Sequence, residues 1–158
     1  MRLRHLVLLS ALVCLPARAE RLRVGDWIGS AGLGFMSSPA LLMISPHLER
    51  VYKPGMFLGG LMQAGFGGGE ALFTMTFTVR YHLGEHPRLR PVLEGGAGIA
   101  SGTKGFSSSF GIAVHMGMGV DYLITPDLAI SSVVRANFAP PLSGFFLSWP
   151  VAQIRYLF

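Results

Sequence analysis

Residues 71–82 read Ala-Leu-Phe-Thr-Met-Thr-Phe-Thr-Val-Arg-Tyr-His, and this stretch decides the fold class. The odd positions from Ala71 to Tyr81 are apolar or aromatic, whereas the even positions from Thr74 to His82 are polar. Successive side chains of a β-strand point to opposite faces, so such a strand has one apolar and one polar face. A tilted transmembrane strand needs about 9–11 residues. The stretch therefore predicts a strand that spans a membrane with its apolar face towards lipid.

The same alternation returns in residues 110–122. Every second residue up to Tyr122 is apolar or aromatic, and the residues between them are small or polar, including His115 and Asp121. Both segments end their apolar face in a tyrosine next to a turn. Aromatic residues are enriched where a membrane barrel meets the lipid headgroups. We therefore expect Tyr81 and Tyr122 to belong to an interfacial aromatic girdle.

Weaker versions of this period predict six more strands, near residues 25–37, 40–52, 56–66, 90–101, 127–138 and 145–158. Turn-forming residues separate the segments, at Ser38-Pro39, Lys53-Pro54-Gly55, Gly67-Gly68-Gly69, Gly84 to Pro87, Gly102 to Gly105, Thr125-Pro126-Asp127 and Ala139-Pro140-Pro141. The sequence predicts an all-β fold, an eight-stranded antiparallel transmembrane up-and-down β-barrel. Because the strand number is even, both termini should lie on the periplasmic side.

The composition favours a membrane barrel over a helical membrane protein. The chain is 51% hydrophobic with a mean hydropathy of +0.49, and its charged share of 13% is about half that of a soluble domain. Beyond the N-terminal segment, no apolar run reaches the roughly 18 residues that indicate a membrane-spanning helix. The hydrophobicity is spread over short pieces, because only every second residue of a barrel strand faces lipid.

Residues 1–19 have the pattern of a cleaved signal peptide. A basic start precedes an apolar run from Leu6 to Leu15, and Ala17-Arg18-Ala19 supplies a small-x-small cleavage site. An N-terminal anchor helix is the alternative, but the run of about ten residues is half the roughly 20 that such a helix needs. Removal of 19 of the 158 residues leaves 139, enough for one domain, and we assign residues 20–158 to the barrel.

Export changes the charge and redox arguments. Lys plus Arg falls from 13 to 10 against 8 acids, so the mature chain has little net charge. A charge this small gives no argument for nucleic-acid binding, despite the sequence pI of about 10.0. The single cysteine, Cys14, leaves with the signal, so disulfides and thiol chemistry are not expected.

The last strand carries a more specific mark. Tyr156 and Phe158 share a face with Ile154, whereas Gln153 and Arg155 lie on the other face. A final strand with alternating apolar residues and a terminal aromatic resembles the assembly signal of outer-membrane β-barrels.

Segments 90–98 and 120–128 also resemble the small opacity-type outer-membrane β-barrel proteins, and as a pattern the likeness covers the whole mature chain. The resemblance implies location in a Gram-negative outer membrane, in contact with outer-membrane lipid and lipopolysaccharide. It also implies recognition by the barrel-assembly machinery through the strand that ends at Phe158. Adhesive members of this family have longer outer loops than the three candidate loops here, 37–41, 66–71 and 102–107, which are short and poor in charge.

The polar faces of the strands predict what fills the barrel. An eight-stranded barrel is just wide enough to be filled by side chains. Unpaired buried charge is very costly, so we expect a plug of salt bridges and hydrogen bonds rather than a narrow ion path. The central members of this polar network are Glu49, Arg80, Glu94, His115, Asp121 and Arg135. The other interior candidates are Asp26, Ser30, Ser45, His47, Gln63, Thr74, Thr76, Thr78, His82, Ser131, Asn137, Gln153 and Arg155.

The sequence predicts no catalytic, cofactor or metal site. Stretch 90–101 resembles lipid A deacylases of this size, which place a histidine and a serine two residues apart on a late strand as base and nucleophile. The corresponding residues 134–138 contain neither, and no histidine is followed by a serine at that spacing. Pairing across strands, for instance of His47 with Ser45 or Thr76, stays open. The histidines of the mature chain are too scattered for a zinc site.

Three classes of function follow from these observations. We favour a structural or surface-interaction role for an integral barrel with a plugged polar interior, which is not an enzyme. The alternative is a lipid A-modifying or lipid-binding barrel, which needs a polar cluster at the level of the outer leaflet. A soluble calyx is the third class. Ten bases and eight acids could hardly cover its exterior, and the C-terminal aromatic strand argues against it.

Overall fold

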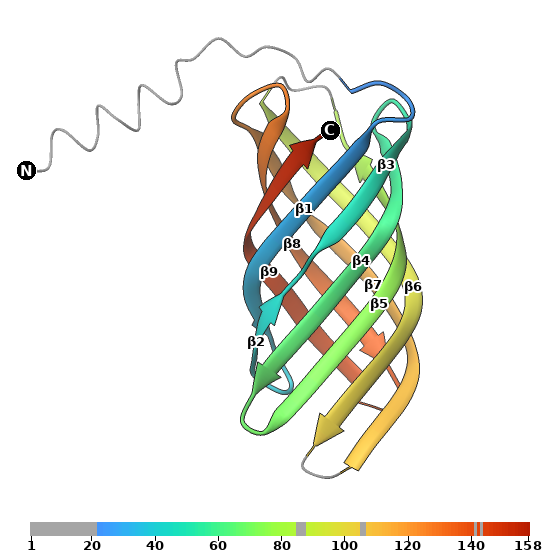
Figure 1. Ribbon diagram of the computed structural model, residues 1–158, viewed down its shortest axis with the longest axis vertical. Helices are drawn as coiled ribbons and strands as arrows, with labels where there is room; N and C mark the ends of the chain where they lie inside the picture. The colour runs from blue at the N-terminus through green and yellow to red at the C-terminus, as the bar shows by residue number, and fades with distance from the viewer. Residues whose placement is uncertain (1–21, 85–87, 105–106, 141, 143) are drawn as a thin grey trace, which may run out of the picture.

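The structure, a computed structural model, describes residues 22–84, 88–104, 107–140, 142 and 144–158, so the predicted signal peptide 1–19 lies outside the described residues. Neighbouring strands of the sheet pair antiparallel, and β1 also pairs with β9, which closes the sheet into a barrel. Figure 1 shows that β1 begins and β9 ends at the same end, which we name the periplasmic end. The described strands are β1 (Trp27–Met36), β2 (Leu41–Ile44), β3 (His47–Lys53), β4 (Met56–Gly67), β5 (Glu70–His82), β6 (Leu89–Lys104), β7 (Ser107–Leu123), β8 (Leu128–Ala139) and β9 (Gly144–Leu157).

Strands β2 and β3 are two parts of one barrel strand. Both pair with β1 on one side and with β4 on the other. Pro46 lies between them and has no N–H to donate to the ladder, which breaks the predicted strand 40–52. Across the break, the backbones of Gly32 and Ser45 still exchange hydrogen bonds of 2.9 and 3.2 Å. The predicted eight-stranded antiparallel barrel is therefore confirmed, with one interruption.

The outer ends of β6 and β7 differ from the sequence prediction. The predicted loop 102–107 is wrong in extent, because β6 continues to Lys104 and β7 begins at Ser107, with these two residues paired. The polar residues here extend a backbone ladder, which does not depend on an alternation of apolar side chains. The β4–β5 connection is as tight, because Gly68 and Gly69 have φ of 59° and 77°, values typical of a two-residue hairpin turn.

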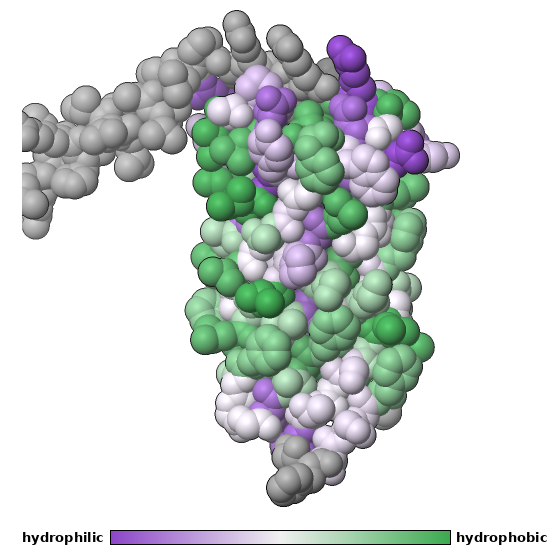
Figure 2. Space-filling view, viewed as in Figure 1, coloured by the Kyte–Doolittle hydropathy of each residue, from purple (hydrophilic) through white to green (hydrophobic). Residues whose placement is uncertain are grey.

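The exterior of the barrel is an apolar belt. Met75, Phe77, Met116 and Met118 are 52%, 61%, 77% and 67% exposed, respectively. Figure 2 shows hydrophobic residues over the middle of the visible face, and strongly hydrophilic residues near the periplasmic end. The four tyrosines lie near periplasmic strand ends, on the same face as the lipid-facing residues, at positions 52, 81, 122 and 156. No helix in the described ranges is long and apolar enough to cross a membrane.

Arginine in the middle of the belt should destabilise the barrel. Phe77→Arg and Met116→Arg should each lower the free energy of unfolding by about 2–4 kcal/mol, because a guanidinium at mid-membrane loses its hydration. The matched control is Tyr81→Arg, at the interface, where the same side chain should cost roughly 0–1 kcal/mol. Urea unfolding in lipid vesicles measures all three. Wild-type stability of the two mid-belt variants would contradict the assigned lipid face.

Candidate functional site

Nine ionisable side chains gather in the half of the barrel lumen nearest the termini. They project from β3, β5, β6, β7, β8 and β9, and none is more than 5% exposed. We call them the ion-pair network, which consists of three carboxylates, three arginines and three histidines: Glu49, Glu94, Asp121, Arg80, Arg135, Arg155, His47, His82 and His115.

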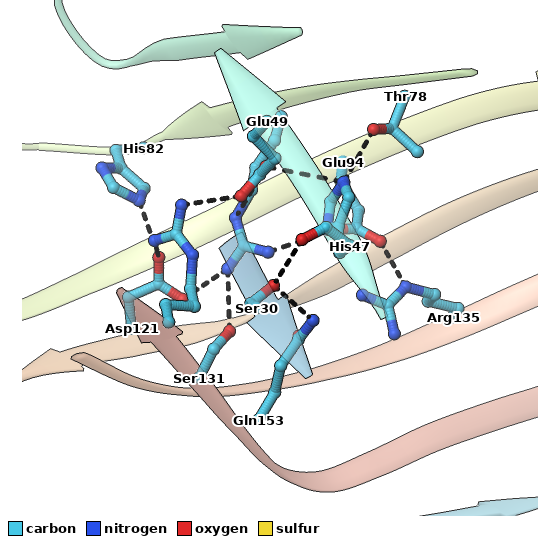
Figure 3. A network of polar contacts seen from close by, with 12 residues as sticks. Ser30, His47, Glu49, Thr78, His82, Glu94, Asp121, Ser131, Arg135 and Gln153 are labelled. Carbon is cyan, nitrogen blue, oxygen red and sulfur yellow. Dashed lines mark hydrogen bonds and ion pairs between the residues drawn. The ribbon is translucent and has the colours of Figure 1, made fainter. Parts of the chain in front are cut away.

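Asp121 is the most heavily bonded acid of the network. Nη2 of Arg80 and Nη1 of Arg155 both donate to its carboxylate. Nε2 of His82 lies 2.8 Å from Oδ2 of the same group, and Arg80 also donates to Oγ of Ser131 at 2.8 Å. Asp121 therefore links three strands that lie far apart in sequence, β5, β7 and β9 (Figure 3).

Glu94, like Asp121, contacts two arginine side chains. Nε of Arg135 donates to its Oε1, and Nη1 of Arg80 approaches Oε2 at 3.4 Å. Nε2 of His115 is 3.7 Å from Oε1, which is too long for a hydrogen bond. Register places Arg80 and Glu94 directly opposite each other on β5 and β6, so the strand pairing itself holds this contact.

Glu49 completes the network. Nη2 of Arg155 donates to its Oε2 at 2.8 Å, and Nε of Arg80 lies 3.9 Å from Oε1. Nε2 of His47 is 3.7 Å from the same oxygen. Each carboxylate thus contacts two arginine or histidine side chains at least. With neutral histidines the three acids and three arginines cancel, which is what burial of charge in a narrow lumen requires.

The structure brings five of the six centrally predicted residues into direct ionic contact. The sixth, His115, lies beside them, but neither of its ring nitrogens has a hydrogen-bond partner. Arg155 was placed only in the wider interior set, although it contacts two carboxylates. The prediction that Asp26 lies in the barrel interior is wrong. This residue precedes β1, is only half-buried, and accepts a hydrogen bond from the Arg23 N–H at 2.7 Å.

Above the network, the lumen changes from charged to neutral and then to apolar. Nε2 of Gln63 donates to Oδ1 of Asn137 at 3.1 Å, which joins β4 to β8 across the barrel. Beyond this bridge, apolar residues close the lumen, which the polar faces of the strands did not indicate. This apolar plug consists of Met36, Leu41, Met43, Leu72, Ala100, Ala113, Ala139 and Phe146, with Leu142 packed against it.

A second apolar layer closes the periplasmic end. Ile28, Val51 and Phe57 form it, with Leu22 and Leu157 packed against them. The ring of Phe57 lies 4.7 Å from that of His82 and 5.5 Å from the guanidinium carbon of Arg155. The ion-pair network therefore lies between two apolar layers.

The outer end of the barrel carries an open recess of about 500 Å³. Its apolar base is made by Leu72 and Leu142, which belong to or pack against the apolar plug. Its polar wall includes a salt bridge of 2.8 Å between Nζ of Lys104 and Glu70. We call it the mouth recess, and it is lined by Ser38, Pro39, Glu70, Ala71, Leu72, Gly102, Thr103, Lys104, Ser107, Ser109 and Leu142.

One histidine is paired with a hydroxyl, as a base with a nucleophile would be. Nε2 of His47 lies 2.8 Å from Oγ1 of Thr78, rather than at Ser45 or Thr76. No acid orients this histidine, because its Nδ1 has no partner and Glu49 lies on the Nε2 side. Both residues are buried in the lumen, at 3% and 0% exposure, so lipid cannot reach them. Within the described ranges, no group of three His, Cys, Asp or Glu side chains is placed to hold a metal ion.

Comparison with known proteins identifies the fold. No protein-family model and no curated protein matches the chain. Among solved structures, Neisserial surface protein A is 16% identical with a TM-score of 0.62, covering 86% of this chain and 98% of that one. The N-terminal barrel domain of Pseudomonas aeruginosa OprF is 12% identical with a TM-score of 0.65, over 86% and 100% of the chains. The outer-membrane enzyme PagL is 15% identical with a TM-score of 0.50, over 82% and 98%.

These likenesses define the class of protein. The chain has the fold of the small eight-stranded outer-membrane barrels, and its apolar belt fits the same environment. Together they place the protein in the outer membrane. At such low identities the likeness extends to the fold alone, and one of these neighbours is an enzyme. Function must therefore be argued from the lumen and the mouth recess.

The contact between Glu94 and Arg135 should be strongly coupled. Glu94→Gln should lower the free energy of unfolding by about 3–5 kcal/mol, because it leaves the guanidinium of Arg135 buried without a carboxylate. Glu94→Gln combined with Arg135→Met should cost less than the two single changes added together. A double-mutant cycle from urea unfolding in lipid vesicles measures this coupling. Strict additivity would show that the contact carries no net interaction.

Proposed function

We propose that this protein is a closed outer-membrane barrel that acts through its outer end, where the mouth recess binds a small amphipathic molecule. The observation that supports this proposal most directly is that the recess lies immediately above the apolar plug. A ligand that enters from outside meets the side chains of Leu72 and Leu142 and can go no further. The barrel therefore works as a membrane-anchored binding surface and does not conduct ions.

The shape and lining of the recess support this class of ligand. Its volume of about 500 Å³ lies within the roughly 300–1,000 Å³ typical of small-molecule sites. The apolar base suits a hydrocarbon or aromatic group, whereas Ser107, Ser109 and the Glu70–Lys104 pair offer hydrogen-bond donors and acceptors at the rim. The β4–β5 connection is a tight turn and adds little surface of its own. Ser38 and Pro39 of the β1–β2 connection line the recess instead.

The filling of the lumen and the number of strands both favour a closed barrel over a pore. The ion-pair network has balanced charge and fully buried arginines, and apolar layers cover it on both sides. An ion would have to displace paired groups and also cross the apolar plug. Aqueous channels are a property of barrels with about 16 strands, whereas eight strands leave an interior that side chains fill.

The alternative of a lipid A-modifying enzyme has less support. Such an enzyme needs a base and a nucleophile at the level of the outer leaflet, within hydrogen-bond reach of each other. The hydroxyl-paired histidine, His47, is buried in the lumen among the ion-pair network, below the apolar plug. The described residues that line the mouth recess include serines and a glutamate but no histidine. We therefore propose a binding role without catalysis.

Three partners belong to the same proposal. The apolar belt would contact outer-membrane lipid, and the outer rim would contact lipopolysaccharide. The last strand, which ends at Phe158, would be recognised by the barrel-assembly machinery. Membership of the opacity-type family is also proposed, on the strength of segments 90–98 and 120–128 and of the shared eight-stranded fold.

Closure and lack of catalysis can be tested on the purified protein. Planar-bilayer recordings should show no sustained conductance, because paired side chains and the apolar plug fill the lumen. Lipid A incubated with the protein should be chemically unchanged. Steady channels that disappear on substitution of Arg135 would contradict closure. Release of fatty acid that depends on His47 would contradict the binding role.

Ligand binding can be tested with hexanol and hexanoate as probes. Both should shift the methyl NMR signals of Leu72 and Leu142 in protein held in nanodiscs. Ser109→Leu fills the recess and should weaken both probes at least tenfold. The matched control is Ser108→Leu, since Ser108 is the adjacent exposed serine on the opposite face of β7, and this variant should bind like wild type. Absence of a shift in the wild type, or equal loss in both variants, would contradict the proposal.

A further inference from the structure

A second hollow lies on the outer wall of the barrel, within the apolar belt. It has a volume of about 790 Å³ and crosses β3, β4, β5 and β6. Its walls are exposed apolar side chains, among them Leu48, Phe77 and Ile99, which are 46%, 61% and 44% exposed. We call it the belt groove.

The groove exists because small residues interrupt a row of large ones. In the strand register, Leu48, Gly60, Phe77 and Ala97 face one another in turn across β3 to β6. A Cβ atom placed on Gly60 would have no heavy atom within 4 Å, so the space above it is open. Gly60 forms the floor between Leu48 and Phe77, and Ala97 leaves a second low position on the far side of Phe77. The result is a groove of about 790 Å³ with an apolar lining that suits hydrocarbon chains.

The periplasmic end of the groove carries a cation. Arg50 is the single charged residue among the described side chains that line it. Its Nε donates to the carbonyl of Gly25 at 3.3 Å, and its guanidinium carbon lies 5.7 Å from the ring centroid of Trp27. These two contacts hold the side chain at the head of the groove. In the described residues it has no carboxylate partner.

We propose that the belt groove binds one anionic phospholipid of the inner leaflet. The phosphate contacts Arg50, Trp27 lies at the glycerol level, and the acyl chains lie over Gly60 and Ala97. Arginine forms strong charge-assisted hydrogen bonds with phosphate, and tryptophan is enriched at the membrane interface. The polar head of the groove lies at the periplasmic end, so inner-leaflet lipid has the right orientation. Outer-leaflet lipopolysaccharide would present its phosphates at the opposite end.

A second copy of the chain fits this groove less well. Two copies in one membrane have the same orientation, so their Arg50 side chains would lie at the same depth. In a two-fold interface centred on the groove, both guanidinium groups would approach each other without a carboxylate between them. Like charges repel strongly where water is excluded. A phosphate at the same position neutralises the charge, which favours the lipid.

Native mass spectrometry of protein purified in mild detergent tests the proposal. The wild type should retain one phospholipid. After removal of lipid, it should bind phosphatidylglycerol about fivefold more tightly than phosphatidylethanolamine. Arg50→Gln should abolish this preference, because it removes the charge and keeps much of the side-chain length. Gly60→Leu should reduce retention of both lipids, because it fills the groove.

Matched variants separate the groove from general effects. Lys53→Gln removes another cation of β3, and Ala136→Leu adds a leucine to the lipid face of β8, outside the groove. Both should retain lipid like the wild type, and the gel mobility of the folded barrel checks every variant. Equal retention in all five proteins would overturn the site. A dimer that disappears in Gly60→Leu would overturn it too, because the occupant would then be a second copy. If Gly60→Leu does not fold, Arg50→Gln alone decides.

Discussion

Every backbone N–H and C=O group inside a hydrocarbon layer must find a partner within the protein, and the rest of this structure depends on that requirement. A sheet meets it only when its two edges join, which the pairing of β1 with β9 achieves here. Closure then separates two environments. The outward face must be apolar because it contacts lipid. The inward face does not contact lipid and need not be apolar. Polar side chains can therefore be buried in the lumen, provided that they satisfy one another.

The lumen satisfies this condition by division into layers. Charges are confined to the periplasmic half, where arginines from three strands contact carboxylates on three others, and the Gln63–Asn137 bridge marks the transition to neutral groups. The outer half needs no polar pairing, because Leu72, Phe146 and their neighbours fill it. This division explains why the mouth recess has an apolar base and a polar rim. The same division forms the recess that we propose as a ligand site.

The alternation of apolar and polar residues was enough to predict the closed barrel and most strand ends, because lipid imposes that alternation on every strand. It could not predict the break at Pro46, since the strand continues in the same register after it. The apolar plug was also missed, because Leu72 and Phe146 lie between outward-facing apolar residues and the contrast between faces is lost there. The sequence placed Arg80 and Arg155 on inward faces. Their carboxylate partners depend on how far neighbouring strands are displaced, which no single strand encodes.

Arg155 lies on the last strand, and the two carboxylates that it contacts come from β3 and β7. Until the seam between β1 and β9 closes, Arg155 and Glu49 lie near opposite edges of the open sheet and cannot pair. A partly closed barrel would thus leave an unpaired charge near each edge, in addition to the unpaired backbone groups of the edges themselves. Ion pairing of side chains and hydrogen bonding of the backbone therefore both favour closure of the β1–β9 seam. Seam formation should consequently be all-or-none, with half-closed intermediates too costly to accumulate, so the arginine of the terminal strand makes membrane insertion cooperative.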